Sequence, residues 1–316
     1  MSDKAGPSTW MKVFLLLCGI VACASASIYI KKSSENDYLL AAWRLLLASI
    51  LMSPMFFAKL RKHRSWFDRR HLRATMLPGI LLGLHFISWI IGLRLTLVAN
   101  ANLIVNMAPV AMPFFLLAVL NEHLNRAEKI GTICAMIGVV CMGFSDYHAD
   151  MQHLKGDMIC FLSMLLFCYY LVLARLNSHF PSVWLYITPL YFVGGVTCLL
   201  AGALVGARPM NQPGAESWLA LYTPYESTWI LLLAVVPTLI GHSLLNYSMK
   251  HLRGQTVGVI NQSQTIFAGL MAYFFLGEAP RAMLYVAAVF LIGGVVIVVQ
   301  ADRNKNSAQP EEVETA

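Results

Sequence analysis

Charged residues are scarce in this chain. Only 12% of its 316 residues are Asp, Glu, Lys or Arg, whereas 58% are hydrophobic and the mean hydropathy is +0.64. Soluble domains carry about 25% charged residues, so this composition excludes an ordinary water-soluble globular protein. The long apolar stretches predict an integral, multi-pass membrane protein that is surrounded by lipid.

The usual signatures of enzymes and pumps are also absent. The sequence contains no HExxH or GxSxG motif and no ATP-binding loop. Its seven cysteines are odd in number, lie in apolar segments and show no CxxC spacing, which argues against a disulfide framework and a zinc site. We therefore expect no catalytic residues, no metal and no cofactor, and a primary pump would need a partner chain.

The net charge of +7 follows from the predicted membrane topology. With the amino terminus in the cytoplasm, sixteen of the 23 Lys and Arg residues fall on the cytoplasmic side and six on the opposite side, as the positive-inside rule expects. The densest group, from Lys59 to Arg73, is suited to anionic lipid headgroups. We therefore predict no nucleic-acid partner, a bacterial inner-membrane location and two cytoplasmic termini.

Ten apolar stretches are long enough, at about 20 residues each, to cross a bilayer. The predicted fold is all-α, with spans at 11–30, 38–58, 75–93, 97–120, 127–145, 157–175, 183–206, 228–249, 255–276 and 282–300. The first stretch resembles a cleavable signal peptide, because Lys12 precedes the apolar run and small residues follow at 22–26. The run continues to Lys32 as a full span, which favours an uncleaved helix.

The two halves of the sequence contain similar hairpins. Residues 116–140 match residues 272–296 with an offset of 156, so that Glu122 corresponds to Glu278. Each half contains five spans. Because five is an odd number, the second half must cross the membrane in the opposite orientation. Substrate sites of such inverted repeats lie where the two halves meet. We predict an N-terminus (1–10), a first repeat (11–145), a linker (146–156), a second repeat (157–300) and a disordered tail (301–316).

Polar side chains are costly inside a bilayer, so their positions predict where a substrate passes. In each half a histidine-bearing span precedes an amide-bearing span, and Asn102, Asn106, Pro109 and Pro113 share one helical stripe. The predicted substrate-binding residues in these and neighbouring spans are His85, Trp89, Asn102, Asn106, Tyr169, His242, Asn246, Asn261, Gln262 and Gln264. Alternatively, the amides serve as interhelical contacts and the histidines and aromatic residues as buried core.

Arg44 is the only permanently charged residue well inside a predicted span, about 9 Å from the outer end of that span. Its guanidinium could extend to the interface, or face a cavity and bind a carboxylate or phosphate of the substrate. No Asp or Glu lies in mid-span, which disfavours a site built to neutralise a cation. Glu122 and Glu278 lie at the hairpin tips, where they could cap the following helix or form a gate.

These motifs together resemble the EamA-type family of the drug/metabolite transporter superfamily, over nearly the whole chain. The resemblance is carried by Arg44-Leu45-Leu46-Leu47-Ala48, Leu103 to Pro109, Asn121-Glu122, Gly156-Asp157, Pro237 to His242 and Leu276-Gly277-Glu278. It implies ten helices in two EamA repeats, cytoplasmic termini and alternating access for small metabolites. The chain departs from the family pattern at Asn121, which replaces the Gly of the first Leu-Gly-Glu, and at Gln264-Thr265, where members often carry a proline.

The expected function is therefore a secondary transporter, an exporter by family resemblance, of small polar or amphipathic metabolites such as amino acids. Protons are the expected coupling ion, because histidine titrates near neutral pH and mid-span carboxylates are absent. The nearly apolar spans 127–145 and 282–300 could act as scaffold or as the face of a homodimer. A channel or a non-transporting signalling component is the alternative, and an intramembrane enzyme is a weaker one.

Overall fold

The protein is described here by a computed structural model that covers residues 9–96, 98–145, 151–209, 224–277 and 282–307, and every regular element in these ranges is helical. The α-helices are α1 (Thr9–Ala24), α2 (Ala26–Lys32), α3 (Asp37–Lys62), α4 (Arg69–Ala74), α5 (Met76–Leu95), α6 (Val98–Val105), α7 (Ala108–Leu120), α8 (Arg126–Ser145), α9 (Met151–Leu176), α10 (Val183–Leu204), α11 (Pro224–Leu233), α12 (Ser243–His251), α13 (Gly254–Asn261), α14 (Gln264–Leu276) and α15 (Ala282–Ser307). A 3₁₀ turn, η1 (Asn177–His179), follows α9, and a π-helix, η3 (Ala234–His242), joins α11 to α12.

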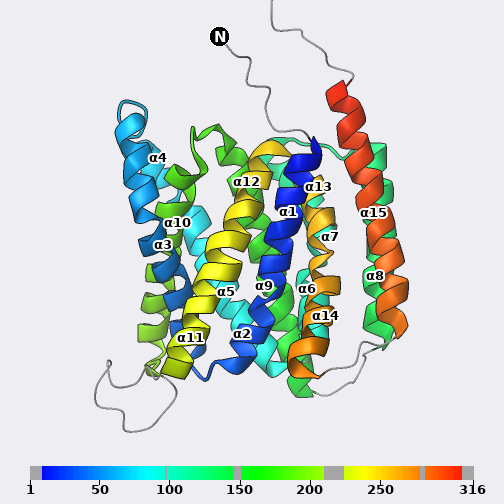
Figure 1. The fold of residues 1–316 in the computed structure, drawn as a ribbon, viewed down its shortest axis with the longest axis horizontal. Coiled ribbons are helices and arrows are strands. Elements are labelled where there is room, and N and C mark those ends of the chain that lie inside the picture. Colours follow the sequence, from blue (N-terminus) through cyan, green and yellow to red (C-terminus); the bar gives the residue numbers. More distant parts are fainter. Residues whose placement is uncertain (1–8, 97, 146–150, 210–223, 278–281, 308–316) are drawn as a thin grey trace, which may run out of the picture.

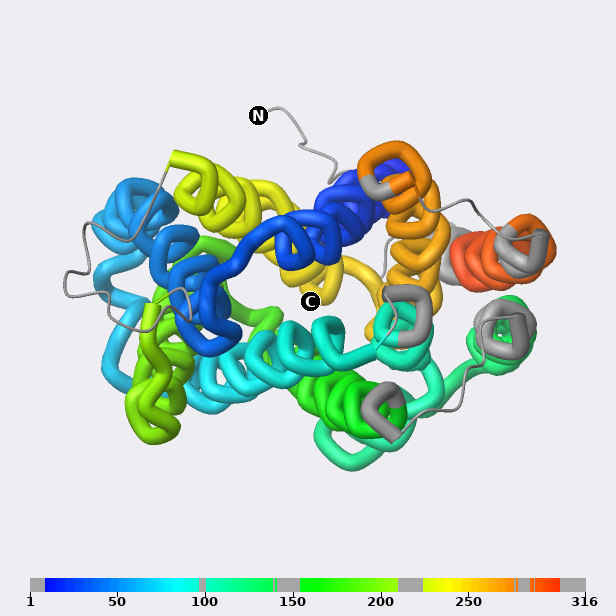
Figure 2. Tube along the Cα trace, turned by 90° about the horizontal axis from the view of Figure 1, so that it is seen from below, coloured from blue at the N-terminus to red at the C-terminus, as the bar shows by residue number. Residues whose placement is uncertain are grey.

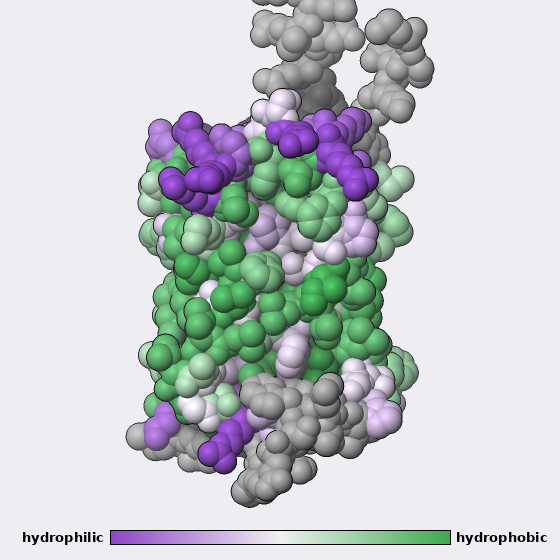
Figure 3. Space-filling view, turned by 90° about the vertical axis from the view of Figure 1, so that its left-hand side faces the viewer, coloured by the Kyte–Doolittle hydropathy of each residue, from purple (hydrophilic) through white to green (hydrophobic). Residues whose placement is uncertain are grey.

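The helices run between two polar ends of an apolar molecule. Within the described residues, seven helical segments are long and apolar enough to cross a membrane: Thr9–Lys32, Asp37–Lys62, Arg69–Leu95, Ala101–Leu120, Leu154–His179, Val183–Leu204 and Pro224–His251. The described chain begins and ends at the same end of the bundle, the upper end in Figure 1. A broad apolar band separates the strongly polar upper end from the lower end (Figure 3). The chain is therefore an integral, multi-pass membrane protein.

Two predicted boundaries differ from the structure. Helix α9 begins at Met151, inside the predicted linker 146–156, and helix α15 continues to Ser307, inside the predicted disordered tail. Apolar runs locate the part of a helix that lies in hydrocarbon, whereas the helix itself can continue through polar residues at its ends. Residues 151–156 and 301–307 therefore extend the helices of the apolar spans 157–175 and 282–300.

Two of the predicted spans are broken in the middle at equivalent positions. Helix α6 ends at Val105 and α7 begins at Ala108, and helix α13 ends at Asn261 and α14 begins at Gln264, so every boundary differs by 156 residues. The predicted span 97–120 is therefore interrupted between Asn102 and Pro109. Since a proline ring cannot follow an uninterrupted helix without a clash, Pro109 in the first turn of α7 accounts for the first break.

The second break has no proline and is made by tight turns. The amide of Gln262 donates to the Val259 carbonyl at 3.2 Å, and the amide of Ser263 donates to the Ile260 carbonyl at 3.0 Å. These bonds skip three residues rather than four, so the last turn of α13 is of the 3₁₀ type. A polar turn therefore replaces the proline at this break.

The two broken spans also end alike. Asn121 after α7 has φ of 52° and Gly277 after α14 has φ of 71°, both in the left-handed region. Asparagine is one of the few residues other than glycine that adopts this conformation readily. The replacement of glycine by Asn121 therefore keeps the same helix ending.

The helices of the bundle pack against one another in pairs. Helix α3 packs against α10, α5 against both α9 and α10, α1 against η3 and α12, and α8 against α15. Viewed along the helices, the α8–α15 pair forms one edge of the molecule and the α3–α10 pair lies at the other (Figure 2). The helices between these pairs surround the region that holds the buried polar residues.

Substituting alanine for Gly83 is expected to destabilise the protein, because the new Cβ would lie 2.6 Å from the Gly194 carbonyl oxygen of α10. Overpacking of this kind costs about 1–3 kcal/mol, which thermal unfolding of the purified protein would detect. Gly293→Ala is the matched control, since its Cβ would make an ordinary 3.5 Å contact with the sulfur of Cys134. Equal melting temperatures for the two variants would contradict the close α5–α10 contact.

Candidate functional site

A small cavity lies where helices from both halves of the sequence meet. Ten helices contribute to its lining: α1, α2, α3, α5, α6, α9, η3, α12, α13 and α14. The lining residues are Cys23, Ala26, Arg44, His85, Phe86, Trp89, Val105, Phe167, His242, Leu245, Asn261 and Gln264. The cavity holds about 30 Å³, room for only a few water molecules. A metabolite would fit only after the surrounding helices separate.

Six of the eleven residues predicted to bind the substrate line this cavity, namely Arg44, His85, Trp89, His242, Asn261 and Gln264. The other five, Asn102, Asn106, Tyr169, Asn246 and Gln262, are not among its lining residues. All of the predicted Asn and His residues, together with Gln262, are buried. The sequence therefore located the polar core, but it did not distinguish the residues that face the cavity from those that join helices.

Two of these five residues make contacts between helices. Asn106, at the break between α6 and α7, donates from Nδ2 to Oγ1 of Thr265 in α14 at 2.8 Å. Gln262, at the corresponding break, directs Nε2 to the sulfur of Met136 in α8 at 3.2 Å. These contacts match the alternative reading of the amides as interhelical contacts.

Two further residues predicted to contact the substrate pack elsewhere. The ring of Tyr169 stacks on Phe115 with centroids 5.4 Å apart, which joins α9 to α7. Asn246 donates from Nδ2 to the Tyr170 hydroxyl and to the carbonyl of His242, one turn earlier. Asn246 therefore lies directly behind a cavity-lining histidine.

Arg44 lies in the core, with only 1% of its surface exposed. Its Nε donates to Oγ1 of Thr238 at 2.9 Å, and its guanidinium carbon lies 3.7 Å from the centroid of the Phe86 ring. Its Nη1 is buried and has no hydrogen-bond partner. Of the two orientations that the sequence left open, the structure has the guanidinium at the cavity and not at the interface.

The partner of Arg44 is held by an unusual backbone. Thr238 lies in the π-helix η3, and its hydroxyl also donates to the Leu233 carbonyl at 2.8 Å. The hydroxyl of Tyr191 donates to the Thr238 carbonyl at 3.3 Å. Single π-helical turns occur frequently at functional sites. Thr238 was not among the predicted site residues, because only Pro237, inside η3, signals an irregular helix at this point.

The two cavity histidines have different surroundings. His85 has Nδ1 3.0 Å from the Ser163 carbonyl and 2.8 Å from the Ser163 hydroxyl, and its ring stacks on Phe167 at 4.8 Å. His242 lies edge-on to the Phe86 ring at 4.9 Å, and its Nδ1 is buried without a hydrogen-bond partner. His85 is thus fixed to α9, whereas His242 keeps a ring nitrogen available.

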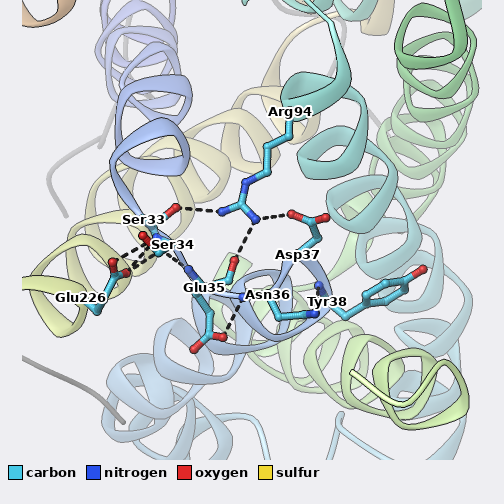
Figure 4. Close-up of polar contacts among 8 residues, drawn as sticks. All are labelled: Ser33, Ser34, Glu35, Asn36, Asp37, Tyr38, Arg94 and Glu226. Carbon is cyan, nitrogen blue, oxygen red and sulfur yellow. Dashed lines mark hydrogen bonds and ion pairs between the residues drawn. The ribbon is translucent and has the colours of Figure 1, made fainter. Parts of the chain in front are cut away.

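A polar cluster lies at the lower end of the bundle (Figure 1). In this Arg94 cluster, Arg94 at the end of α5 pairs with Asp37 of α3 and donates from Nη2 to the Ser33 carbonyl at 2.9 Å (Figure 4). Glu226 of α11 accepts from the Ser33 hydroxyl and from the Ser34 amide, each at 3.0 Å. The cluster therefore joins the α2–α3 connection to α5 and to α11.

A second cluster lies at the opposite end, where α12 meets α13. In this Arg253 cluster, Arg253 hydrogen-bonds Glu128 at the start of α8 and lies 3.5 Å from Glu122. Arg175 at the end of α9 approaches the same Glu122 carboxylate, with Nε 3.6 Å from Oε2. Glu122 was predicted at a hairpin tip, but its two arginine partners, which are distant in sequence, were not predicted.

Glu122 does not cap the helix that follows it. The cap of α8 is formed by Asn125 and Glu128, each of which accepts from the backbone amide of the other, at 2.8 and 2.7 Å. This is the reciprocal capping box that the Asn-x-x-Glu spacing favours. The capping prediction for Glu122 is therefore wrong, and Glu278 lies outside the described residues.

Buried polar and charged side chains thus meet between the membrane helices of a polytopic membrane protein. The profile of the EamA-like transporter family matches residues 10–144 and 154–300, and the chain belongs to this family. Two relatives are both named uncharacterized transporters of Archaeoglobus fulgidus. One is 28% identical over 66% of this chain and 70% of its own length. The other is 22% identical over 90% of this chain and 95% of its own length. A crystal structure with 16% identity superposes with a TM-score of 0.72, over 94% of this chain and 99% of its own, and supports the fold.

Proposed function

We propose that this membrane transporter is a secondary transporter, which exports small polar or amphipathic metabolites, such as amino acids, by alternating access. The proposed architecture has ten spans in two inverted five-helix repeats, 11–145 and 157–300, with both termini in the cytoplasm. The observation that carries the proposal is the pair of broken helices, α6–α7 and α13–α14, beside the buried cavity. Discontinuous helices near the midplane are typical of substrate sites in such transporters.

Three features support the repeat arrangement. The broken spans have equal segment lengths and an offset of 156 residues. The helix pairs α3–α10 and α8–α15 each join corresponding predicted spans of the two halves. The described chain begins and ends at one end of the bundle, as an even number of spans requires (Figure 1). The basic segment Lys59–Arg73 lies at the same end, which is therefore the proposed cytoplasmic side.

The cavity is placed where a broken helix can contribute to binding. Asn261 is the last residue of α13 and Gln264 the first of α14, and both line the cavity, as does Val105 at the end of α6. The side-chain oxygen of Asn261 is buried without a hydrogen-bond partner. Irregular backbone inside a membrane is tolerated where it lines a cavity. We therefore assign the substrate site to the space between the two breaks.

Alternating access requires that each end of the bundle can close. The Arg94 cluster links first-half residues to Glu226 of the second half, and the Arg253 cluster links Glu122 of the first half to Arg175 and Arg253 of the second. With both clusters formed, the cavity holds about 30 Å³. In the proposed cycle the two clusters open in turn, each admitting the substrate from one side of the membrane.

Flux through proteoliposomes with an imposed proton gradient tests the proposal. A panel of amino acids and related metabolites is expected to contain at least one compound with saturable transport that is accelerated by unlabelled compound on the opposite side. Gln264→Ala should reduce this transport about tenfold, the equivalent of ~1.4 kcal/mol. Ser53→Ala, whose hydroxyl bonds the Ile50 carbonyl within α3, should leave it unchanged. Flux proportional to concentration would identify a channel instead, and no flux for any compound would reject the proposal.

A further inference from the structure

Arg44 lines the cavity and forms no ion pair with a carboxylate of the described residues. We propose that Arg44 binds a carboxylate or phosphate group of the transported compound, an inference that rests on the proposed transport function and narrows the substrate to small anionic or zwitterionic metabolites. Arg44 carries an unsatisfied charge, the cavity wall has a composition that suits an anion, and the guanidinium is held in a fixed position.

The charge of Arg44 is unsatisfied. A guanidinium stays protonated in proteins, and this one is 99% buried, has an unpartnered Nη1 and forms no ion pair with any carboxylate in the described residues. Burial of an unpaired charge is costly. The Phe86 ring at 3.7 Å offsets part of that cost through a cation–π contact. An anion in the cavity would supply the missing partner.

Two other arginines, Arg94 and Arg253, have their charge paired with a carboxylate. Arg94 pairs with Asp37 and donates to the carbonyls of Glu35 at 2.8 Å and Ser33 at 2.9 Å. Arg253 pairs with Glu128 in the same way. Arg44 differs from both, although it is the most buried of the three and therefore has the most to gain from an anion.

The wall of the cavity favours an anion and disfavours a cation. None of the twelve described lining residues is Asp or Glu. His242 lines the same cavity with an unpartnered Nδ1, which donates a hydrogen bond in one of its two neutral tautomers and in its protonated form. A cavity lined by one sign of charge concentrates ligands of the opposite sign. The wall therefore offers hydrogen-bond donors from two different helices to one acidic group.

The guanidinium is held in place before any ligand arrives. Thr238 fixes Nε at 2.9 Å and is itself held by the Leu233 carbonyl, while the Phe86 ring covers the guanidinium plane. Nη1 remains available on a group that is already ordered. Arginine binds carboxylates and phosphates through two parallel N–H bonds, and ordering in advance lowers the entropy lost on binding. Thr238 and Phe86 are thus positioning residues for Arg44.

Calorimetric titration of the full-length protein in nanodiscs tests the inference with matched probes. The probes are alanine and alaninamide, phenylalanine and phenylalaninamide, and phenethyl phosphate. We expect an acid to bind at least about 30-fold more tightly than its amide, the usual range when a buried charge loses its partner. If the phosphate ester binds and the acids do not, the anionic group is a phosphate. Arg44→Gln should remove the preference, and Arg44→Lys, which keeps the charge without the fork, should retain part of it.

The control is Arg61→Gln, which removes a positive charge from the exposed end of the same helix and should leave binding unchanged. Equal binding of acids and amides, acid preference that survives in Arg44→Gln, or no binding of any acid or phosphate would overturn the inference. If Arg44→Gln does not fold, the acid–amide comparison in the unaltered protein and in Arg44→Lys decides. Arg44-dependent binding without flux would refute transport alone, whereas saturable flux of amides only would refute the anion site alone.

Discussion

Replacing His85 and His242 together by glutamine is expected to abolish the response of transport to a proton gradient while exchange without a gradient continues. Among the described residues that line the cavity, these two are the histidines, the residue type whose unperturbed side chain titrates closest to neutral pH. Arg44 stays charged throughout this range. Glutamine has a similar size and can still hydrogen-bond Ser163, so the helix contact made by His85 should survive.

The expected size of the effect on substrate accumulation follows from the free energy of the proton gradient. For one coupled proton, a gradient of one pH unit corresponds to ~1.4 kcal/mol, or about a tenfold accumulation. The double variant should fall from about tenfold to no accumulation, measured as labelled substrate in proteoliposomes at equal and at unequal pH. The groups that face these histidines are the Arg44 cation, the Phe86 and Phe167 rings and Ser163. The double substitution leaves all of them in place.

The matched control is His251→Gln, which alters an exposed histidine at the end of α12. This variant should keep the full gradient response. The single variants then separate the roles: His242, with its unpartnered Nδ1, is expected to account for more of the response than His85, which is bonded to α9. An unchanged gradient response in the double variant would exclude proton coupling through these residues.

The positions of the membrane-crossing helices could be predicted from the sequence, because bilayer thickness sets the length of their apolar runs. The length of an apolar run reports how much of a helix crosses hydrocarbon, and the predicted spans lie on helices throughout the described residues. Seven helical segments there meet the length and hydropathy expected of a membrane span. The break at Gln262 and the π-helix at Thr238 could not be predicted, because no apolar periodicity marks them and the first lacks a proline.

The site was predicted in part, for a related reason. The cost of a polar side chain in lipid indicates which residues face protein, and His85 and Asn261 are buried at the cavity as this predicts. For Arg44 the sequence left the interface and the cavity open, and the structure has it at the cavity. The cost in lipid does not identify which neighbouring helix each residue faces. Asn106 turns to Thr265 because its helix breaks beside it. Glu122 meets Arg253 only because α7 and α13 pack together, a contact that sequence spacing does not reveal.

Substituting glutamine for Arg94 is expected to open the lower end of the bundle and to expose Cys23, which lines the cavity and is now 5% accessible. Arg94 makes charge-assisted bonds to Asp37 and to backbone carbonyls. Each such bond contributes about 1.5–3 kcal/mol, so loss of the cluster should raise the open population about tenfold or more. The measurement is the rate at which a membrane-impermeant thiol reagent modifies Cys23 in a variant without other cysteines.

The direction of the reagent makes this a test of alternating access. Arg94→Gln should speed modification from the side of the α2–α3 connection and slow it from the other side, because opening one end favours closure of the opposite cluster. Arg253→Gln, which loses Glu128 and Glu122 as partners, should do the reverse. Lys32→Gln removes an exposed charge beside the Arg94 cluster and should change neither rate. If Arg94→Gln and Lys32→Gln react alike, the Arg94 cluster does not hold the lower end closed. If both Arg variants speed modification from both sides, the two ends open independently, as in a channel.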